Sequence, residues 1–146
     1  AELAGYKVDT KRWSRLSEYA AQNFPNMGQS FADLHASLSH AMAGNDEYLQ
    51  KYIEGKNGFA GDIIPCIAKA WKAITKGEWL IAAQELAPNI DDFERFGGSR
   101  AQRDLLEFTY VSVLLRAGEA KKAKSVLLKR RPKFSQTAPI KLLGQI

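Results

Sequence analysis

This chain of 146 residues has little of what disulfide-bonded, metal-binding or membrane-spanning proteins use. It has one cysteine, Cys66, which cannot form an internal disulfide. Because Cys66 lies in an apolar run and free cysteine packs like a small hydrophobe, we interpret it as a core residue in a reducing, cytoplasmic compartment. No apolar run approaches the roughly 20 residues that cross a bilayer, so we expect no membrane-spanning helix and no membrane partner.

Only two histidines are present, His35 and His40, which limits both metal binding and Ser-His-Asp catalysis. Two metal ligands on one helix face stand three or four residues apart, whereas a five-residue step turns the second side chain by about 140°. We therefore expect His35 to be a hydrogen-bonded residue at the edge of the core, with His40 pointing elsewhere. Three acids, Asp91, Asp92 and Glu94, stand in an expected first helical turn, where the helix dipole favours them. We predict no metal, no cofactor and no catalytic residue.

Strand signals are also missing, and the 3.6-residue spacing of amphipathic helices recurs instead. A chain of this length can bury a core without a metal or a disulfide. The sequence thus predicts a single all-α domain, 1–146, of about seven or eight helices. They are expected near 10–23, 30–43, 46–54, 62–75, from 78 to the proline at 88, 99–116, 119–129 and 139–144, with 89–95 as a further helical piece.

Apolar stripes on these helices predict the core. In the second helix, Ser30 and Asp33 resemble a capping box. In the helix 99–116 the stripe is widened by Leu106, Val113 and Leu114, which indicates burial on two sides. The residues expected to face inward include Trp13, Leu16, Ala20, Phe24, Phe31, Leu34, Leu38, Met42, Ile64, Ile67, Ala68, Trp71, Ile74, Trp79, Leu80, Ala82, Ala83, Leu86, Leu105, Phe108, Val111, Ser112 and Leu115.

Three glycine turns suggest a repeat. Gly44, Gly77 and Gly118 each join two expected helices, and they are 33 and 41 residues apart. A tetratricopeptide unit is a helix-turn-helix of about 34 residues, whose neighbours must stack to bury their apolar faces. The spacing is irregular and the full consensus is absent. We therefore predict a tetratricopeptide-like α-α superhelix of stacked hairpins, with an irregular helical bundle as the alternative.

Two groups of residues are candidates for ligand contacts. Tyr48 and Tyr52 are four apart on a short helix and could line a peptide groove, although the aromatics of this chain lie mostly on core stripes. Arg100 and Arg103 follow the turn 97–99 at a helix start, where backbone amides favour an anion. The alternative at this turn is a structural cap, in which Ser99 and Gln102 use those amides.

The basic C-terminal part is the remaining charge feature. From Gly118 onward eight Lys and Arg oppose one acid, Glu119, which gives this part +7 and leaves residues 1–117 at −2. Such an excess can attract anionic partners. We interpret it instead as the solvated outer face of the last helices, so nucleic acid is not an expected partner.

One stretch resembles a known family. Residues 96–104, Phe-Gly-Gly-Ser-Arg-Ala-Gln-Arg-Asp, with the apolar helix that follows and the Arg-Ala-Gly at 116–118, are similar to the C-terminal part of the tetratricopeptide repeat protein 38 family. The segments 31–35 (Phe-Ala-Asp-Leu-His) and 77–78 (Gly-Glu) extend the resemblance over about residues 8 to 145. It implies an α-α superhelix and, because family members are longer, a C-terminal fragment of a longer repeat protein. It implies no activity.

We therefore expect a non-catalytic scaffold for protein-protein interaction, with a protein or peptide as its partner. One alternative is a structural cap that closes a longer array by docking on upstream repeats of the parent chain. The other is an anion-binding or enzymatic module around Arg100, Arg103 and the basic C-terminal part.

Overall fold

The computed structural model describes residues 3, 6–96, 100–130 and 132, and these form an all-α fold without strands. The prediction of an all-α class is confirmed. None of the described helices is long and apolar enough to cross a membrane. The elements are α1 (Thr10–Asn23), α2 (Ser30–Ala43), α3 (Asp46–Glu54), α4 (Ile64–Thr75), α5 (Trp79–Leu86), the 3-10 helix η2 (Ala87–Phe96), α6 (Arg100–Arg116) and α7 (Ala120–Arg130). The expected helix at 139–144 lies outside the described residues.

Three turns share one backbone geometry. Gly44, Gly77 and Gly118 have φ values of 70°, 73° and 80°, the left-handed region that favours glycine. After each glycine, the next amide donates to the carbonyl five residues back, at 2.9, 2.9 and 2.8 Å. This is the Schellman motif, which satisfies the last carbonyls of a helix while reversing the chain. The turns therefore make three similar helix pairs, α2 with α3, α4 with α5 and α6 with α7.

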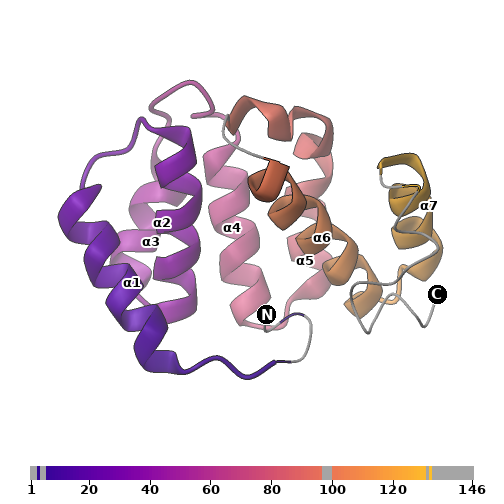
Figure 1. Ribbon diagram of the computed structural model, residues 1–146, viewed down its shortest axis with the longest axis horizontal. Coiled ribbons are helices and arrows are strands. Elements are labelled where there is room, and N and C mark those ends of the chain that lie inside the picture. Colours follow the sequence, from indigo (N-terminus) through magenta and orange to yellow (C-terminus); the bar gives the residue numbers. More distant parts are fainter. Residues whose placement is uncertain (1–2, 4–5, 97–99, 131, 133–146) are drawn as a thin grey trace.

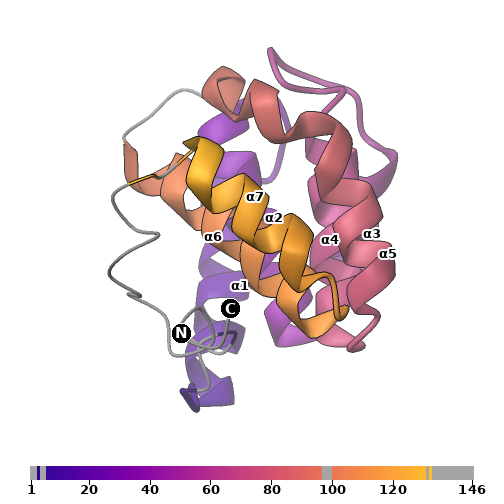
Figure 2. The ribbon, with the colours of Figure 1, turned by 90° about the vertical axis from the view of Figure 1, so that its right-hand side faces the viewer.

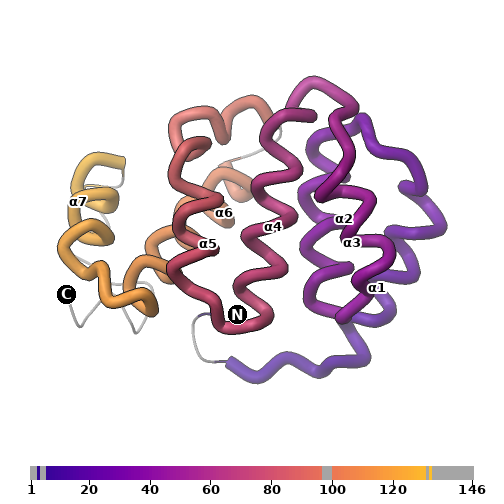
Figure 3. Tube along the Cα trace, turned by 180° about the vertical axis from the view of Figure 1, so that it is seen from behind, coloured from indigo at the N-terminus to yellow at the C-terminus, as the bar shows by residue number. Residues whose placement is uncertain are grey.

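The helices pack in chain order from α1 to α7 (Figure 1). α2 packs against α1, α3 and α4, whereas α6 packs against α5, η2 and α7. In Figure 3, which shows the molecule from behind, α3, α4 and α5 are nearest the viewer. In Figure 1, α2 and α6 flank α4 on the opposite side, and Figure 2 shows α7 at the end of the array.

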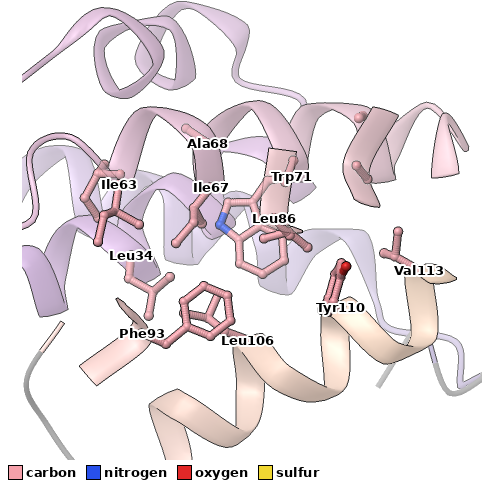
Figure 4. Packing of buried hydrophobic residues seen from close by; sticks show 14 of the residues in the cluster. Leu34, Ile63, Ile67, Ala68, Trp71, Leu86, Phe93, Leu106, Tyr110 and Val113 are labelled. Carbon is pink, nitrogen blue, oxygen red and sulfur yellow. The ribbon is translucent and has the colours of Figure 1, made fainter. Parts of the chain in front are cut away.

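The spacing of α6 is set by η2. Pro88 prevents α5 from continuing as a regular α-helix, and the chain forms ten residues of 3-10 helix instead. Phe93 of this segment is fully buried and lies beside Leu106 of α6 and Leu34 of α2 (Figure 4). η2 thus packs against α2, α5 and α6, and α4 with α6 is not among the closely packed pairs of the described elements. The second and third helix pairs therefore meet through α5, η2 and α6.

Charged pairs hold this arrangement at its edges. The guanidinium of Arg130 on α7 contacts Asp91 of η2 at 2.6 Å and Glu107 of α6 at 3.0 Å. Glu107 is buried, and its pairing with Arg130 offsets part of the cost of burying a carboxylate. Arg95 of η2 binds Asp62 at 2.7 Å and the carbonyl of Phe59 at 2.8 Å. The hydrogen bond from Arg95 lowers the pKa of the Asp62 carboxyl.

Several local expectations were wrong. Ser30 and Asp33 form no capping box: Ser30 accepts a hydrogen bond from the Ala60 amide at 3.1 Å, and Asp33 accepts one from the Gly28 amide at 3.0 Å. Both therefore hold loops against α2. The Cys66 side chain is only half-buried.

Three residues expected in the core are exposed: Leu16 by 50%, Phe31 by 47% and Leu80 by 57%. On α1 the buried positions are Ser17 and Ala20, whose small side chains let α1 approach α2 closely. Ala20 is thus buried as expected, whereas Ser17 and not Leu16 is the other buried position of α1.

The glycine turns give a test of this geometry. Gly44→Ala should lower the free energy of unfolding by about 1 kcal/mol, measured by urea denaturation, because a Cβ disfavours the left-handed region. The space around the Gly44 Cα is open, so a steric clash does not add to this cost. Gly44→Asn should cost less, since asparagine tolerates that region. Equal losses for the two variants would show that the backbone conformation is not the cause.

Candidate functional site

An apolar groove of about 660 Å³ is hollowed into the described structure. It lies between α2 and α6, and residues of α4, α1 and α5 complete its lining. We call it the tryptophan groove. Its walls are formed by Leu3, Trp13, Leu38, Met42, Trp71, Ile74, Thr75, Trp79, Asp104, Leu105, Phe108, Thr109, Ser112 and Arg116.

All three tryptophans of the chain border this groove. Trp71 of α4 is 2% exposed and joins the groove to the core around Leu86 and Tyr110 (Figure 4). Trp13 of α1 and Trp79 of α5 are partly exposed. Tryptophans in partly desolvated concave surfaces are frequent binding anchors, because each buries a large rigid area.

Arg116 supplies the positive charge at the groove. Its guanidinium lies over the Trp79 ring, 4.9 Å from the centroid, which is a cation-π arrangement. One of its nitrogens, Nη2, donates a hydrogen bond to the backbone carbonyl of Leu3 at 3.0 Å. The Arg116 guanidinium is thus held in place by the Trp79 ring while its Nη2 binds a backbone carbonyl.

The hydroxyls of the groove are largely used within their own helices. Ser112 donates to the carbonyl of Phe108 at 2.7 Å, and Thr75 donates to the carbonyl of Lys72 at 2.8 Å. The groove therefore offers apolar contact in its walls and charge from Arg116 and Asp104. Such a surface suits a ligand with bulky apolar groups and an exposed carbonyl or other acceptor.

A second cluster, the His40 cluster, joins α1, α2 and α3. His40 is 1% exposed, and its Nδ1 is hydrogen-bonded to Ser17 Oγ at 2.8 Å. Asn45 donates to the same oxygen at 3.3 Å, and the Tyr48 ring stacks on the imidazole with centroids 5.2 Å apart. Burial lowers the pKa of His40, and the charge of Lys51 lowers it further. Ser17 is 2% exposed, so the hydrogen-bonded pair at the centre of the cluster is a buried connection between α1 and α2.

The carboxyl of Asp33 lies nearby in α2 and is 1% exposed as a residue. Burial raises its pKa, against the opposing effect of the hydrogen bond from Gly28. Burial together with the Asp33 charge raises the pKa of Tyr52 to about 12. The Tyr52 hydroxyl donates to the carbonyl of Phe24 at 3.4 Å. These groups hold the loop before α2 against α3.

The candidate contact residues from the sequence do not meet in one place. Tyr48 and Tyr52 both pack on His40, and Tyr52 is only 4% exposed. Arg100 is exposed and pairs weakly with Asp104 at 3.9 Å, and Arg103 is half-buried. The turn 97–99 lies outside the described residues, so the proposed anion site there stays a prediction. None of the four residues lines the tryptophan groove.

The acidic and histidine residues are also dispersed. His35 packs edge-on against Phe31 with ring centroids 4.9 Å apart, and Asp91 pairs with Arg130. In the part of the chain that the structure describes, no three or more His, Cys, Asp or Glu side chains gather closely enough to hold a metal ion.

The chain matches no protein-family model, and no curated protein or solved structure matches it. The function is therefore inferred from the chemistry of the protein's own surfaces.

The His40 cluster predicts how stability depends on pH. Because the pKa of His40 is lower in the folded state than its ordinary 6.5, the unfolded chain binds the proton first and stability falls as pH drops below about 6.5. The same holds for His35, whose pKa is lowered by burial. Urea denaturation from pH 7.5 to 5 should show a smaller loss for His40→Gln than for the wild-type chain.

His35→Gln is the matched control, since it removes the other histidine outside the cluster. The double variant should show the smallest loss over this range. Asp33 is common to all four proteins, so its own titration cancels in the comparison. An unchanged loss in His40→Gln would contradict the assigned role of His40.

Proposed function

We propose that this chain is a helical-repeat scaffold of the tetratricopeptide type, which binds a peptide segment of a partner protein in the tryptophan groove. The three Schellman turns and the stacked helix pairs support the repeat type. The resemblance of residues 96–104 to the tetratricopeptide repeat protein 38 family supports it independently. A non-catalytic role in the cytoplasm belongs to the same proposal.

The observation that carries this proposal is the apolar groove bordered by every tryptophan of the chain. Its volume of about 660 Å³ exceeds what one side chain fills, so a segment with two or more apolar side chains is the expected occupant. Burial of a leucine-sized side chain contributes about 1.5–3 kcal/mol. Two such side chains and a hydrogen bond give an affinity in the range of transient interactions.

The chemistry of Arg116 further defines the partner. An extended peptide presents free backbone carbonyls, and Arg116 already binds one such carbonyl, that of Leu3. We infer that the partner segment is extended near α6 and inserts bulky apolar side chains between Met42 and Phe108. An acceptor group on the segment then lies beside the guanidinium.

A structural cap is the second candidate, and the outer face of α1 favours it. Leu16 and Tyr19 are 50% and 58% exposed and stand three residues apart, on one face of α1. Among the described elements α1 packs closely only against α2. A further helical hairpin of a longer parent chain is the occupant this face fits. In that case Leu16→Glu would lower the thermal midpoint of the parent by several degrees and change that of this chain little; similar changes in both would contradict the cap.

Selection from random displayed peptides tests the groove. Enriched peptides should carry at least two bulky apolar residues, and their binding should shift the tryptophan emission, because all three fluorophores border the groove. Met42→Lys should weaken binding at least tenfold by placing a charge in an apolar wall.

Ile81→Lys is the control, since Ile81 is 48% exposed on α5 and does not line the groove. Both substitutions place a lysine on a partly exposed helix position, and helicity measured by circular dichroism checks the fold of each. Equal affinities of the two variants would locate the binding surface elsewhere and contradict the proposal.

A further inference from the structure

The tryptophan groove is contacted by a residue far from it in sequence. Leu3 precedes α1, yet its carbonyl accepts the hydrogen bond from Arg116, 113 residues away. Leu3 is partly buried and contributes to the groove lining. Leu3 thus presents an apolar side chain to the groove and a backbone carbonyl to Arg116. The proposed peptide partner would present the same two groups.

Because of the position of Arg116, Leu3 and a partner peptide cannot both occupy this point of the groove. The guanidinium is fixed over the Trp79 ring, so the nitrogen that binds the Leu3 carbonyl is directed to one place. A partner carbonyl at that place requires the Leu3 carbonyl to leave. The apolar surface that the Leu3 side chain covers is likewise withdrawn from a partner.

We propose that Leu3 is an intramolecular occupant of the tryptophan groove, which competes with peptide partners and lowers their apparent affinity. This inference rests on the proposed function and specifies its regulation. The competing group is tethered to the same chain, so its effective concentration is in the millimolar range, and even a weak contact is then occupied for much of the time. A partner meets only the fraction of molecules in which the groove is free, and its apparent affinity falls by that fraction.

The positive charge of Arg116 determines which partners would displace Leu3 most readily. A partner that places a carboxylate beside Arg116 gains a charge-assisted hydrogen bond, which is stronger than the bond to the neutral Leu3 carbonyl. The groove should thus favour apolar segments with an acidic group at the Arg116 end. Segments with only neutral acceptors form the same kind of bond as the Leu3 carbonyl and lack the advantage of its tether.

Leu3→Ser tests the competition outside the α-helices, because it removes the apolar side chain without adding a charge beside Arg116. The probe is 1-anilinonaphthalene-8-sulfonate, an apolar dye with an anionic group, together with the intrinsic tryptophan emission. Leu3→Ser should move the emission to longer wavelength and tighten dye binding by about threefold or more, because the segment loses its apolar anchor and leaves the groove. Tyr6→Ser is the matched control: Tyr6 also precedes α1, is 64% exposed and does not line the groove.

A second arm supplies the occupant from outside. A synthetic peptide with the sequence of residues 1–8, added to the Leu3→Ser protein, should displace the dye and restore the wild-type emission. The same peptide with serine in place of its leucine should do neither.

Equal dye affinity and emission in the wild-type, Leu3→Ser and Tyr6→Ser proteins would overturn the proposal. Its failure is distinct from failure of the proposed function. If selected peptides bind the wild-type and Leu3→Ser proteins equally tightly, only the competition is contradicted. If no displayed peptide binds either protein while the dye still responds to Leu3→Ser, the occupation of the groove by Leu3 stands and the peptide-binding function is contradicted.

Discussion

The packing of Phe93 between α2 and α6 is the contact on which the rest of this molecule depends. Phe93 is fully buried beside Leu34 and Leu106, so η2 packs against both α2 and α6. α2 and α6 therefore share a core contact through Phe93 at one end. Along the remainder of their length the tryptophan groove lies between them. Arg130 and Arg95 hold η2 at its surface through Asp91 and Asp62. The groove is thus a consequence of how the second and third helix pairs are joined.

Two buried polar clusters have their partners away from this groove. The His40 cluster lies among α1, α2 and α3, where Ser17 and Asn45 satisfy the imidazole and its partner hydroxyl. The buried carboxyl of Glu107 is met by Arg130 beneath α7. Within the groove, the Ser112 hydroxyl is bonded to its own helix, so a ligand can contact the apolar walls without breaking that bond. The bond from Arg116 to the Leu3 carbonyl is the one that a ligand at the Arg116 end would replace.

Much of the fold was predictable because its signals are local. The glycine turns, Pro88 and the apolar spacing placed the helices within a few residues of their observed bounds. The groove was not predictable, since an apolar helical stripe looks the same whether it faces a core or a groove. Phe108, Met42 and Trp79 were all expected in the core for this reason. The bond between Ser17 and His40 joins residues 23 apart across two helices, and no local pattern marks it.

The order in which the helices pack also determines how the chain can reach its folded state. Except for α2 with η2, every closely packed pair joins elements that are next or next but one along the chain. Such short-range topology requires little loop closure, so it favours rapid folding from several starting points. α7 contacts the rest of the array through α6 and the Arg130 bridge, and it is accordingly the element that can detach at the lowest free-energy cost.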